Sequence, residues 1–474
     1  MKKISLLLSA LVMLSCANEK KQIETLKTDA FVPISETDYE NAIIYEANIR
    51  QYSPEGTFEA FTKDIPQLKD LGVKIIWLMP IHPISLTNRK AKGNLNVEDI
   101  ENEQEREKYL GSPYSISDYT AVNPDFGTKD DLDKLIKTAH DNGMYVILDW
   151  VANHTGWDHK WIQTNSDFYY KNDKGEVVDP INYATGESWG WTDVAHLNYE
   201  NKELWEAMKN DMLYWVKEHN LDGFRCDVAG EIPTPFWEFV VPKLKEIKPI
   251  FMLAESEKKD LFFHAFDMGY NWEGHHIKNE IAAQKQTVAQ WDAYMQKIDT
   301  TFQADDILMN FITNHDENSW NGTVQERMGD AGEAMLALIY TLPGMPLIYS
   351  GQEYDLNHRL KFFEKDEIPK TKSKNWPILE KLGKLKSNNI ALHGGKNAAD
   401  YTRITTTSDE NVLAFKREKG DNTIIYIANM SSKETSFTIN QEGIFKNYMH
   451  DESRTLDKKT TYSFAPWEYV ILVK

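Results

Sequence analysis

Residues 221–231 read LDGFRCDVAGE, a short apolar run interrupted by Arg225 and Asp227. The run has the length of a buried strand, and burying either charge alone would be costly. Residues two apart on a strand share a face, so the arginine would hold the aspartate ionised and oriented. This pairing predicts a functional site at the end of the strand.

Seven similar strand signals flank this stretch, and most of them alternate with helical patterns. The predicted strands are 42–49, 73–79, 144–150, 221–226, 250–255, 266–270, 307–313 and 346–350. The predicted helices are 58–71, 129–142, 201–220, 235–245, about 276–298, 331–340 and about 374–388. Continuous apolar runs suit parallel strands that are buried on both faces. Eight such units predict an α/β fold, a (β/α)8 TIM barrel over residues 39–396.

Two long segments interrupt the barrel pattern, and a different pattern follows it. Residues 154–199 form an insertion after the third strand, and residues 84–112 form a polar loop after the second. Long connections after barrel strands are often functional. Residues 397–474 carry short strands without helices at 412–417, 423–428, 436–439 and 468–473. They predict a C-terminal antiparallel β-sandwich domain.

The N-terminus has the pattern of a targeting signal. Lys2 and Lys3 precede an apolar run that ends at Cys16, and that run is too short to span a bilayer. We interpret residues 1–16 as a lipoprotein signal peptide with Cys16 as the lipidated residue, the alternative being ordinary signal cleavage. Residues 17–38 are polar, and we predict that they form a flexible tether between the membrane and the folded domain. The expected location is the bacterial cell envelope, on either face of the outer membrane.

Composition narrows the choice of partners. The formal net charge of −20 argues against nucleic acid, whose phosphates such a surface repels. It is compatible with a neutral substrate such as a sugar. We expect a monomer that contacts the membrane only through its lipid anchor.

Charged side chains end four of the predicted strands. The groups are Asp149, Asn153 and His154 on the third strand, Arg225 and Asp227 on the fourth, Glu255 on the fifth, and His315 and Asp316 on the seventh. A single aspartate in such a place is more often a helix cap or turn residue. All strands of a barrel end at one rim, however, so the joint pattern predicts one pocket that holds these groups.

This set of groups fits glycoside hydrolysis. A retaining enzyme uses one carboxylate as nucleophile and a second as acid/base, about 5 Å apart. We assign Asp227 as the nucleophile and Glu255, kept protonated by burial and neighbouring charge, as the acid/base. Asp316 would hold the sugar hydroxyls and help to distort the ring.

At these residues the chain resembles the α-amylase superfamily, glycoside hydrolase family 13. The matching segments are DWVANH (149–154), GFRCD (223–227), Glu255, NHD (314–316), GSPYSISDY (111–119) and PGMPLIYSGQE (343–353). The resemblance implies a barrel, a domain B at residues 154–199 and a C-terminal β-sandwich. It also implies catalytic Asp227, Glu255 and Asp316, and substrate-binding Tyr114, Asp149, His154, Arg225 and His315. The implied reaction is retaining hydrolysis of α-1,4 bonds in starch-like glucans or maltooligosaccharides.

The chain departs from typical α-amylases at two places. Gly230 and Glu231 replace a Lys-His pair, and the resulting DVAGE is closer to neopullulanases and cyclomaltodextrinases. His196 stands where α-amylases often carry a calcium-binding aspartate, which leaves Asn153 as a candidate metal ligand. Calcium prefers several oxygen ligands, so we expect no required cofactor and a weakened calcium site.

Two other functions stay open at this stage. One is transfer of the glycosyl group to a sugar hydroxyl, and the other is glucan binding by an inactive scaffold. In the insertion, Trp157, Trp161, Trp189 and Trp191 would either stack on glucose rings or pack that domain. We predict a solvated loop for the segment that contains Lys90, Lys92 and the acidic run 98–107.

Overall fold

The computed structural model describes residues 31–93, 95–182 and 185–474. The predicted signal peptide, Cys16 and most of the predicted tether lie outside the described residues. The tether prediction extended too far, because Ile34 is buried and helix α1 (Glu36–Glu40) begins after the capping residue Ser35. Residues 33–474 form one compact unit. No helix in the described ranges has the length and apolar character needed to cross a membrane.

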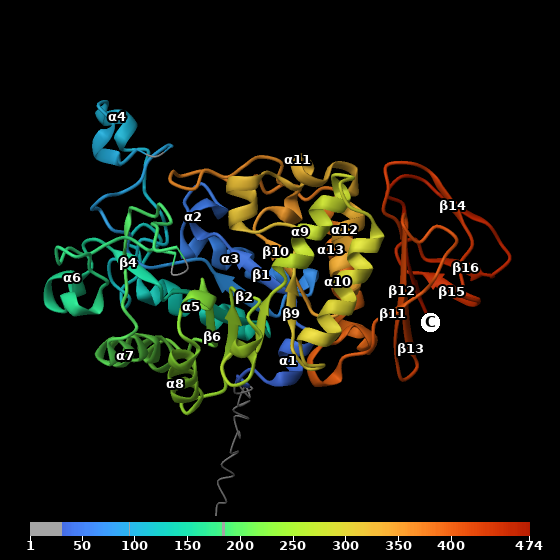
Figure 1. Ribbon diagram of the computed structural model, residues 1–474, viewed down its shortest axis with the longest axis horizontal. Helices are drawn as coiled ribbons and strands as arrows, with labels where there is room; N and C mark the ends of the chain where they lie inside the picture. Colours follow the sequence, from blue (N-terminus) through green and yellow to red (C-terminus); the bar gives the residue numbers. More distant parts are fainter. Residues whose placement is uncertain (1–30, 94, 183–184) are drawn as a thin grey trace, which may run out of the picture. The chain divides into compact units, whose positions relative to one another are not determined.

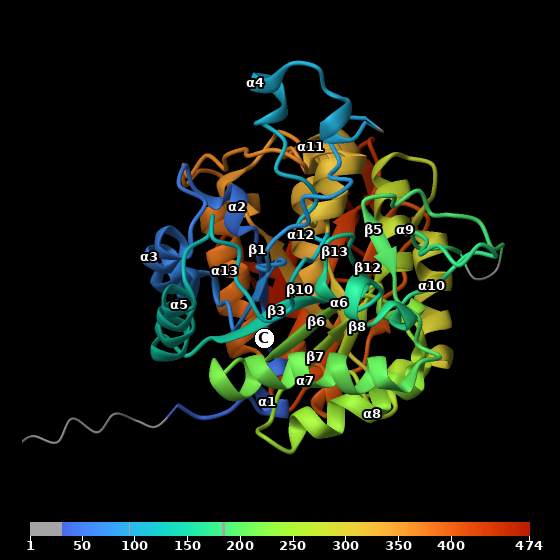
Figure 2. The same ribbon diagram turned by 90° about the vertical axis from the view of Figure 1, so that its left-hand side faces the viewer.

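Eight parallel strands close into a barrel, which confirms the predicted fold (Figures 1 and 2). The strands are β1 (Ile44–Ala47), β2 (Ile75–Leu78), β3 (Tyr145–Val151), β6 (Gly223–Asp227), β7 (Phe251–Ala254), β8 (Met268–Tyr270), β9 (Leu308–Asn310) and β10 (Met345–Tyr349). Strand β1 pairs in parallel with both β2 and β10, which closes the ring. Every residue of these strands is buried, as expected for a sheet covered on its outer face by helices and filled inside by side chains.

Helices cover the outside of the barrel. They are α3 (Phe58–Leu68), α5 (Lys129–Asp141), α7 (Lys202–Glu218), α8 (Thr234–Lys245), α9 (Trp272–Ala282), α10 (Val288–Thr301), α12 (Gly332–Thr341) and α13 (Asn375–Asn388). All of them except the almost fully buried α12 are amphipathic or partly exposed. Shorter helices are α2 (Ile49–Tyr52) and α11 (Val324–Met328). The single helix predicted at about 276–298 is wrong, because the chain breaks between α9 and α10. Gln284 takes a left-handed conformation there, and Thr287 caps the start of α10.

The insertion after β3 is small and irregular. Its strands β4 (His154–Gly156) and β5 (Val194–His196) pair antiparallel, and helix α6 (Lys160–Thr164) lies between them in sequence. The pairing brings the two ends of the insertion together beside the end of β3. We call residues 154–199 domain B.

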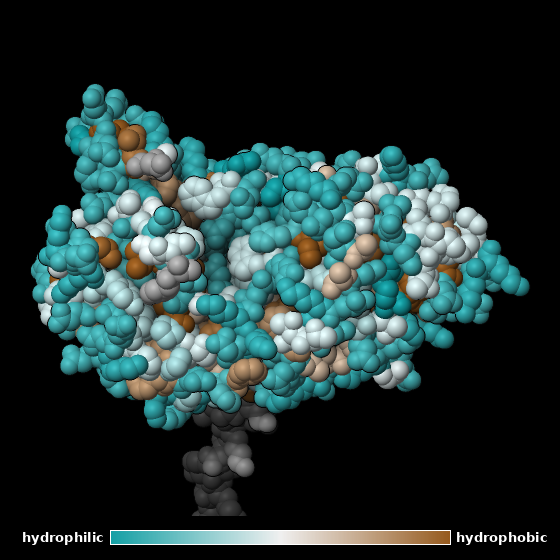
Figure 3. All heavy atoms as spheres, viewed as in Figure 1, coloured by the Kyte–Doolittle hydropathy of each residue, from teal (hydrophilic) through white to brown (hydrophobic). Residues whose placement is uncertain are grey.

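The polar loop after β2 is more ordered than predicted. It contains helix α4 (Glu103–Arg106) and a small apolar cluster formed by Ala91, Val97, Ile100 and Tyr109. Figure 1 shows α4 projecting at the upper left, and Figure 3 shows the surface hollowed next to the base of this projection. We call residues 84–112 the strap.

The C-terminal residues form an antiparallel β domain, which confirms that prediction. Its strands are β11 (Thr402–Arg403), β12 (Val412–Lys419), β13 (Asn422–Asn429), β14 (Thr435–Phe437), β15 (Gly443–Asn447), β16 (Glu452–Leu456), β17 (Tyr462–Phe464) and β18 (Tyr469–Val473). Six of them form one sheet in the order β11-β12-β13-β18-β15-β16, and β14 pairs with β17. One face of the sheet meets the barrel, where the Tyr426 hydroxyl donates to the carbonyl of Ala334 in α12.

Candidate active site

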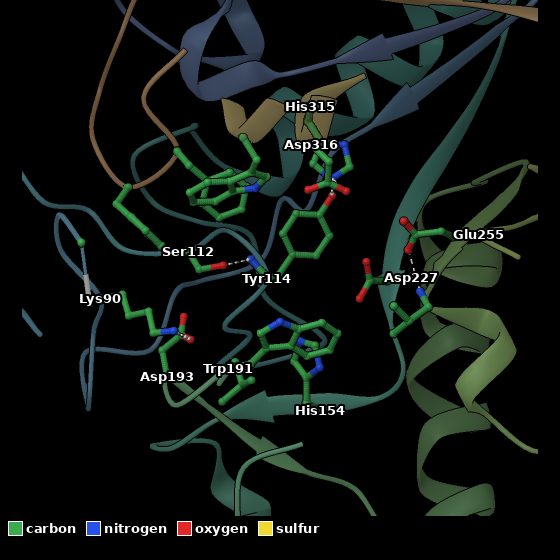
Figure 4. Close-up of a pocket in the computed structure, with 16 residues that line it drawn as sticks. Lys90, Ser112, Tyr114, His154, Trp191, Asp193, Asp227, Glu255, His315 and Asp316 are labelled. Atoms are coloured by element: carbon green, nitrogen blue, oxygen red, sulfur yellow. Dashed lines mark hydrogen bonds and ion pairs between the residues drawn. The ribbon is translucent and has the colours of Figure 1, made fainter. Parts of the chain in front are cut away.

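A cavity of about 370 Å³ opens where the barrel strands end (Figure 4). Asp227 closes β6, Glu255 follows β7, and the segment after β9 carries His315 and Asp316; all four line the cavity. Parallel strands place their carboxyl ends on one rim, which is why groups far apart in sequence meet here. The structure therefore brings together the three carboxylates that the sequence singled out.

Arg225 lies beneath this cavity and holds two of the carboxylates. Its Nη1 is 2.9 Å from Asp227 Oδ1, and its Nη2 is 2.9 Å from Glu255 Oε2. Both carboxyl groups therefore lie within ion-pair distance of one planar guanidinium, although Nη2 makes no well-aligned hydrogen bond. Its side chain is fully buried and lies 4.8 Å from the ring of Trp77, a cation–π contact that the sequence analysis missed.

Asp149 does not reach the cavity, and the prediction that it binds substrate is not supported. It is buried, and it accepts hydrogen bonds from Arg225 Nη1 at 2.9 Å, Trp77 Nε1 at 3.1 Å and the Tyr114 hydroxyl at 3.0 Å. Arg225 is likewise fully buried, so both residues are positioning residues rather than substrate ligands.

Glu255 lies in surroundings that favour its protonated form. Burial raises its pKa to about 8; Asp227 and Asp316 add to this effect, while Arg225 opposes it. The Val228 backbone N–H donates to Glu255 Oε2 at 2.7 Å. Val228 is held at φ 36°, and a β-branched residue in this region is strained by about 1–3 kcal/mol. The chain thus turns sharply after Asp227 and aims a backbone donor at Glu255.

His315 links the far wall of the cavity to β1. Its Nδ1 lies 2.5 Å from Glu46 Oε1, and its Nε2 lies 2.8 Å from the Tyr114 hydroxyl and 3.4 Å from Asp316 Oδ2. Burial disfavours its charged form, but Asp316 and Glu46 outweigh burial and raise the pKa of His315 to about 9. Glu46 was missed by the sequence analysis, although a lone carboxylate inside the apolar strand 42–49 is a visible signal.

Comparison with known proteins is consistent with this geometry. Residues 32–236 match the family model described as alpha amylase, catalytic domain. Residues 32–236 are thus similar to an alpha-amylase catalytic domain. This similarity supports the predicted glycosidase activity.

The relatives include both amylases and glycosyl transferases. The chain is 25% identical to "Alpha-amylase 3" of Dictyoglomus thermophilum, over 92% of this chain and 93% of the other. It is 24% identical to an α-1,4-glucan:maltose-1-phosphate maltosyltransferase of Salinibacter ruber, but spans only 58% of that protein. A crystal structure of a maltogenic alpha-amylase from Thermotoga neapolitana has a TM-score of 0.80 at 27% identity, covering 92% of this chain and 99% of that one.

Tyr114 also lines the cavity. Its ring stacks on His315 with centroids 5.3 Å apart and lies nearly parallel to Phe362 at 6.2 Å. Its hydroxyl is hydrogen-bonded to Asp149 and His315, which fixes the ring in place. The predicted aromatic platform is therefore positioned in the cavity.

Domain B contributes one wall. His154 lines the cavity, and burial lowers the pKa of its imidazole. Among the four tryptophans considered there, Trp191 lines the cavity and stacks on the exposed Trp189. Trp161 is buried against Phe168 of domain B and Tyr119 outside it. Trp320, Phe362 and Phe363 also line the cavity, and the sequence analysis missed them because no motif marks them.

Asn153 does not fit a calcium site of the amylase type. Its side-chain nitrogen lies 3.3 Å from His154 Nδ1, and His196 is the residue paired across from His154. These neighbours offer imidazole nitrogen, whereas calcium requires several oxygen ligands. The described residues contain no group of three or more His, Cys, Asp or Glu side chains arranged to hold a metal ion. The assignment of Asn153 as a metal ligand stays a prediction.

Lys90 contradicts the prediction of a solvated loop. Its side chain is only 15% exposed, lines the cavity and pairs with Asp193 of domain B at 3.7 Å. Lys92 does behave as predicted: it is 57% exposed and pairs with Glu105 within the strap. Two lysines two residues apart thus have different environments, which only the folded strap distinguishes.

Proposed function

We propose that this chain is a retaining glycosidase that hydrolyses α-1,4 bonds in starch-like α-glucans or maltooligosaccharides. The observation that carries the proposal is the shared guanidinium of Arg225, which holds Asp227 and Glu255 by its two terminal nitrogens. Two carboxyl groups within ion-pair distance of one guanidinium fit the separation of about 5 Å in retaining enzymes better than the roughly 6.5–9.5 Å of inverting ones.

In the proposed mechanism, Asp227 attacks the anomeric carbon of a glucose unit resting on Tyr114. Glu255 donates its proton to the departing glycosidic oxygen as the bond to that oxygen breaks. The glycosyl–Asp227 ester then reacts with water, whose proton returns to Glu255, and the product keeps its α-configuration. Asp316 holds sugar hydroxyls and, with the other carboxylates, stabilises the positive charge that develops on the ring.

The environment of Glu255 supports its part in this scheme. A general acid must hold its proton at the working pH, and burial together with Asp227 and Asp316 raises the pKa of Glu255. Once Asp227 is esterified its negative charge is gone, which lowers the pKa of Glu255 and suits it to act as the base in the second step.

Product analysis tests the proposal. We would incubate the protein with soluble starch, pullulan, cyclodextrins and maltotriose, and follow the anomeric proton of fresh products by NMR. We expect maltooligosaccharides released first as α-anomers, and no release by Asp227→Asn or Glu255→Gln variants. Release of β-anomers would overturn the retaining mechanism. Activity retained by Asp227→Asn would remove that residue as nucleophile, and release of reducing sugar by neither wild type nor variants would favour an inactive, glucan-binding scaffold.

Transfer to a sugar hydroxyl is the second candidate. Relatives named as maltosyltransferase and 4-alpha-glucanotransferase match 81% and 63% of this chain. The aromatic wall formed by Trp320, Phe362 and Phe363 would also suit a sugar acceptor. Products longer than the substrate, formed from maltotriose without equivalent reducing sugar, would favour transfer. Preference for pullulan or cyclodextrins over starch would instead favour neopullulanase-like specificity.

We further propose that Cys16 is lipidated and anchors the enzyme in the bacterial cell envelope as a monomer. The proposal rests on the charged and apolar pattern of residues 2–16. A Cys16→Ala variant should move from the membrane fraction to the soluble fraction. Membrane association that survives the substitution would exclude this anchor.

A further inference from the structure

The strap connects the two walls of the cavity. On the domain B side, Lys90 Nζ donates to the carbonyl of Gly190 at 2.7 Å, and the Leu86 N–H donates to Asp158 Oδ2 at 2.8 Å. At the other end of the strap, the N–H groups of Leu110 and Gly111 donate to the carbonyl of Phe363 at 2.7 and 3.2 Å. The strap therefore runs from domain B to the loop after β10, and its residues Lys90, Gly93 and Ser112 line the cavity.

Lys90 and Asp193 are the charged pair at this wall. Their side chains are 15% and 8% exposed, and both line the cavity together with Gly93. The backbone carbonyl of Asp193 accepts a hydrogen bond from Ser115 Oγ at 2.9 Å, which ties this part of domain B to the segment that carries Tyr114. The pair is thus held from three sides: by the strap, by domain B and by the floor of the cavity.

The position of the Lys90–Asp193 pair relative to Glu255 indicates which end of the bound sugar chain the pair faces. In Figure 4, Lys90 and Asp193 lie on one side of the cavity and Glu255 on the opposite side, with Tyr114 and Asp227 between them. The leaving part of the substrate departs on the side of the acid that protonates it. The Lys90–Asp193 pair consequently faces the part of the sugar chain that stays bound to Asp227.

We propose that the Lys90–Asp193 pair closes the cavity at the non-reducing end of the bound glucan. The enzyme would then accept a free chain end, fit only a short run of glucose units before the scissile bond, and release one short product. This inference rests on the proposed glycosidase function and specifies its substrate: linear α-glucans with a free non-reducing end. The apolar cluster inside the strap, which includes Ala91 and Tyr109, keeps this wall in place.

Maltoheptaose labelled at its reducing end is the first probe. Wild type should release one unlabelled short product from the earliest time point, leaving labelled chains shortened by that same length. Cyclodextrins, which have no chain end, should be turned over slowly. In Lys90→Ala, the ratio of cyclodextrin to maltoheptaose turnover should rise on the order of tenfold, and the set of products should broaden.

Two variants in the strap provide controls. Lys92→Ala removes an exposed lysine two residues away and should keep the wild-type products and ratio. Lys90→Arg retains a cation that can reach Gly190 and Asp193, and it should stay close to wild type. A cooperative thermal transition near that of wild type establishes that Lys90→Ala is folded. If Lys90→Ala does not fold, Asp193→Asn replaces it, and the ratio of cyclodextrin to maltoheptaose turnover should rise by the same amount.

The outcomes separate the two proposals. Internal cleavage of maltoheptaose by wild type, with an unchanged ratio in Lys90→Ala, would overturn the closed end while leaving the glycosidase intact. Absence of any activity that depends on Glu255 would overturn both.

Discussion

Arg225 has no exposed surface, and it lies against three carboxyl groups that belong to different parts of the barrel rim. Asp149, Asp227 and Glu255 each lie 2.9 Å from one of its terminal nitrogens. Removing one partner of a buried ion pair costs about 3–5 kcal/mol, because the other charge is left without compensation. Burying these charged groups costs desolvation free energy. In return, their contacts with Arg225 keep the two reactive carboxyl groups close to each other.

At this scale the raised pKa of Glu255 leads to a prediction about pH. The acid step needs the protonated form, so kcat/KM on starch should fall as pH rises through the raised pKa of Glu255, near 8. Glu255→Gln should lose about 10²–10⁴-fold in rate on starch. An α-maltosyl fluoride needs no protonation to leave, so on this substrate the variant should form the glycosyl-enzyme with little loss. A wild-type alkaline limb well below neutral pH would contradict this assignment.

At the scale of elements, the barrel strands and the start of helix α10 are marked by different features of the sequence. The apolar runs predicted all eight barrel strands, because burial on both faces leaves a continuous local pattern. The sequence analysis did not predict the break between α9 and α10, because residues 283–287 contain no Gly or Pro to mark it. Instead, Thr287 and Gln290 form a capping box that starts a new helix.

This cap can be measured. Thr287→Ala removes the side chain that accepts from the Ala289 N–H, and it should lower the free energy of unfolding by about 1 kcal/mol. Thr300→Ala, at the exposed far end of the same helix, is the matched control and should change stability by less than about 0.5 kcal/mol. Urea denaturation followed by circular dichroism would compare them. Equal effects would show that Thr287 does not stabilise α10 as a cap.

At the scale of the whole molecule, a buried arginine joins the C-terminal sheet to the barrel. Arg417 lies on β12, and its Nη1 donates to the carbonyl of Leu342 at 2.9 Å. Its Nη2 donates to the carbonyl of His393 at 2.9 Å. Burial lowers the pKa of Arg417 to about 9. These carbonyls belong to the segments after α12 and α13. Arg417 therefore links the C-terminal sheet to the barrel by hydrogen bonds.

We therefore expect the barrel and the C-terminal domain to unfold together. Arg417→Ala leaves several buried carbonyls without donors and should lower the free energy of unfolding by about 3–5 kcal/mol. Arg454→Ala, on the more exposed β16, should have a much smaller effect. Calorimetry should show a single transition that moves to lower temperature in Arg417→Ala. Two separate transitions in wild type would contradict this coupling.

The sequence by itself determined the barrel, the position of domain B, the C-terminal β domain and the candidate carboxylates Asp227, Glu255 and Asp316. Strand patterns are local, and residues at strand ends reach one rim whatever the loops do. Only the tertiary structure decided that Asp149 and Arg225 are buried supports, that Glu46 meets His315, and that Lys90 and Trp320 reach the cavity. Those contacts join segments far apart in the chain, and their geometry depends on how long loops fold over the rim, which no local periodicity records.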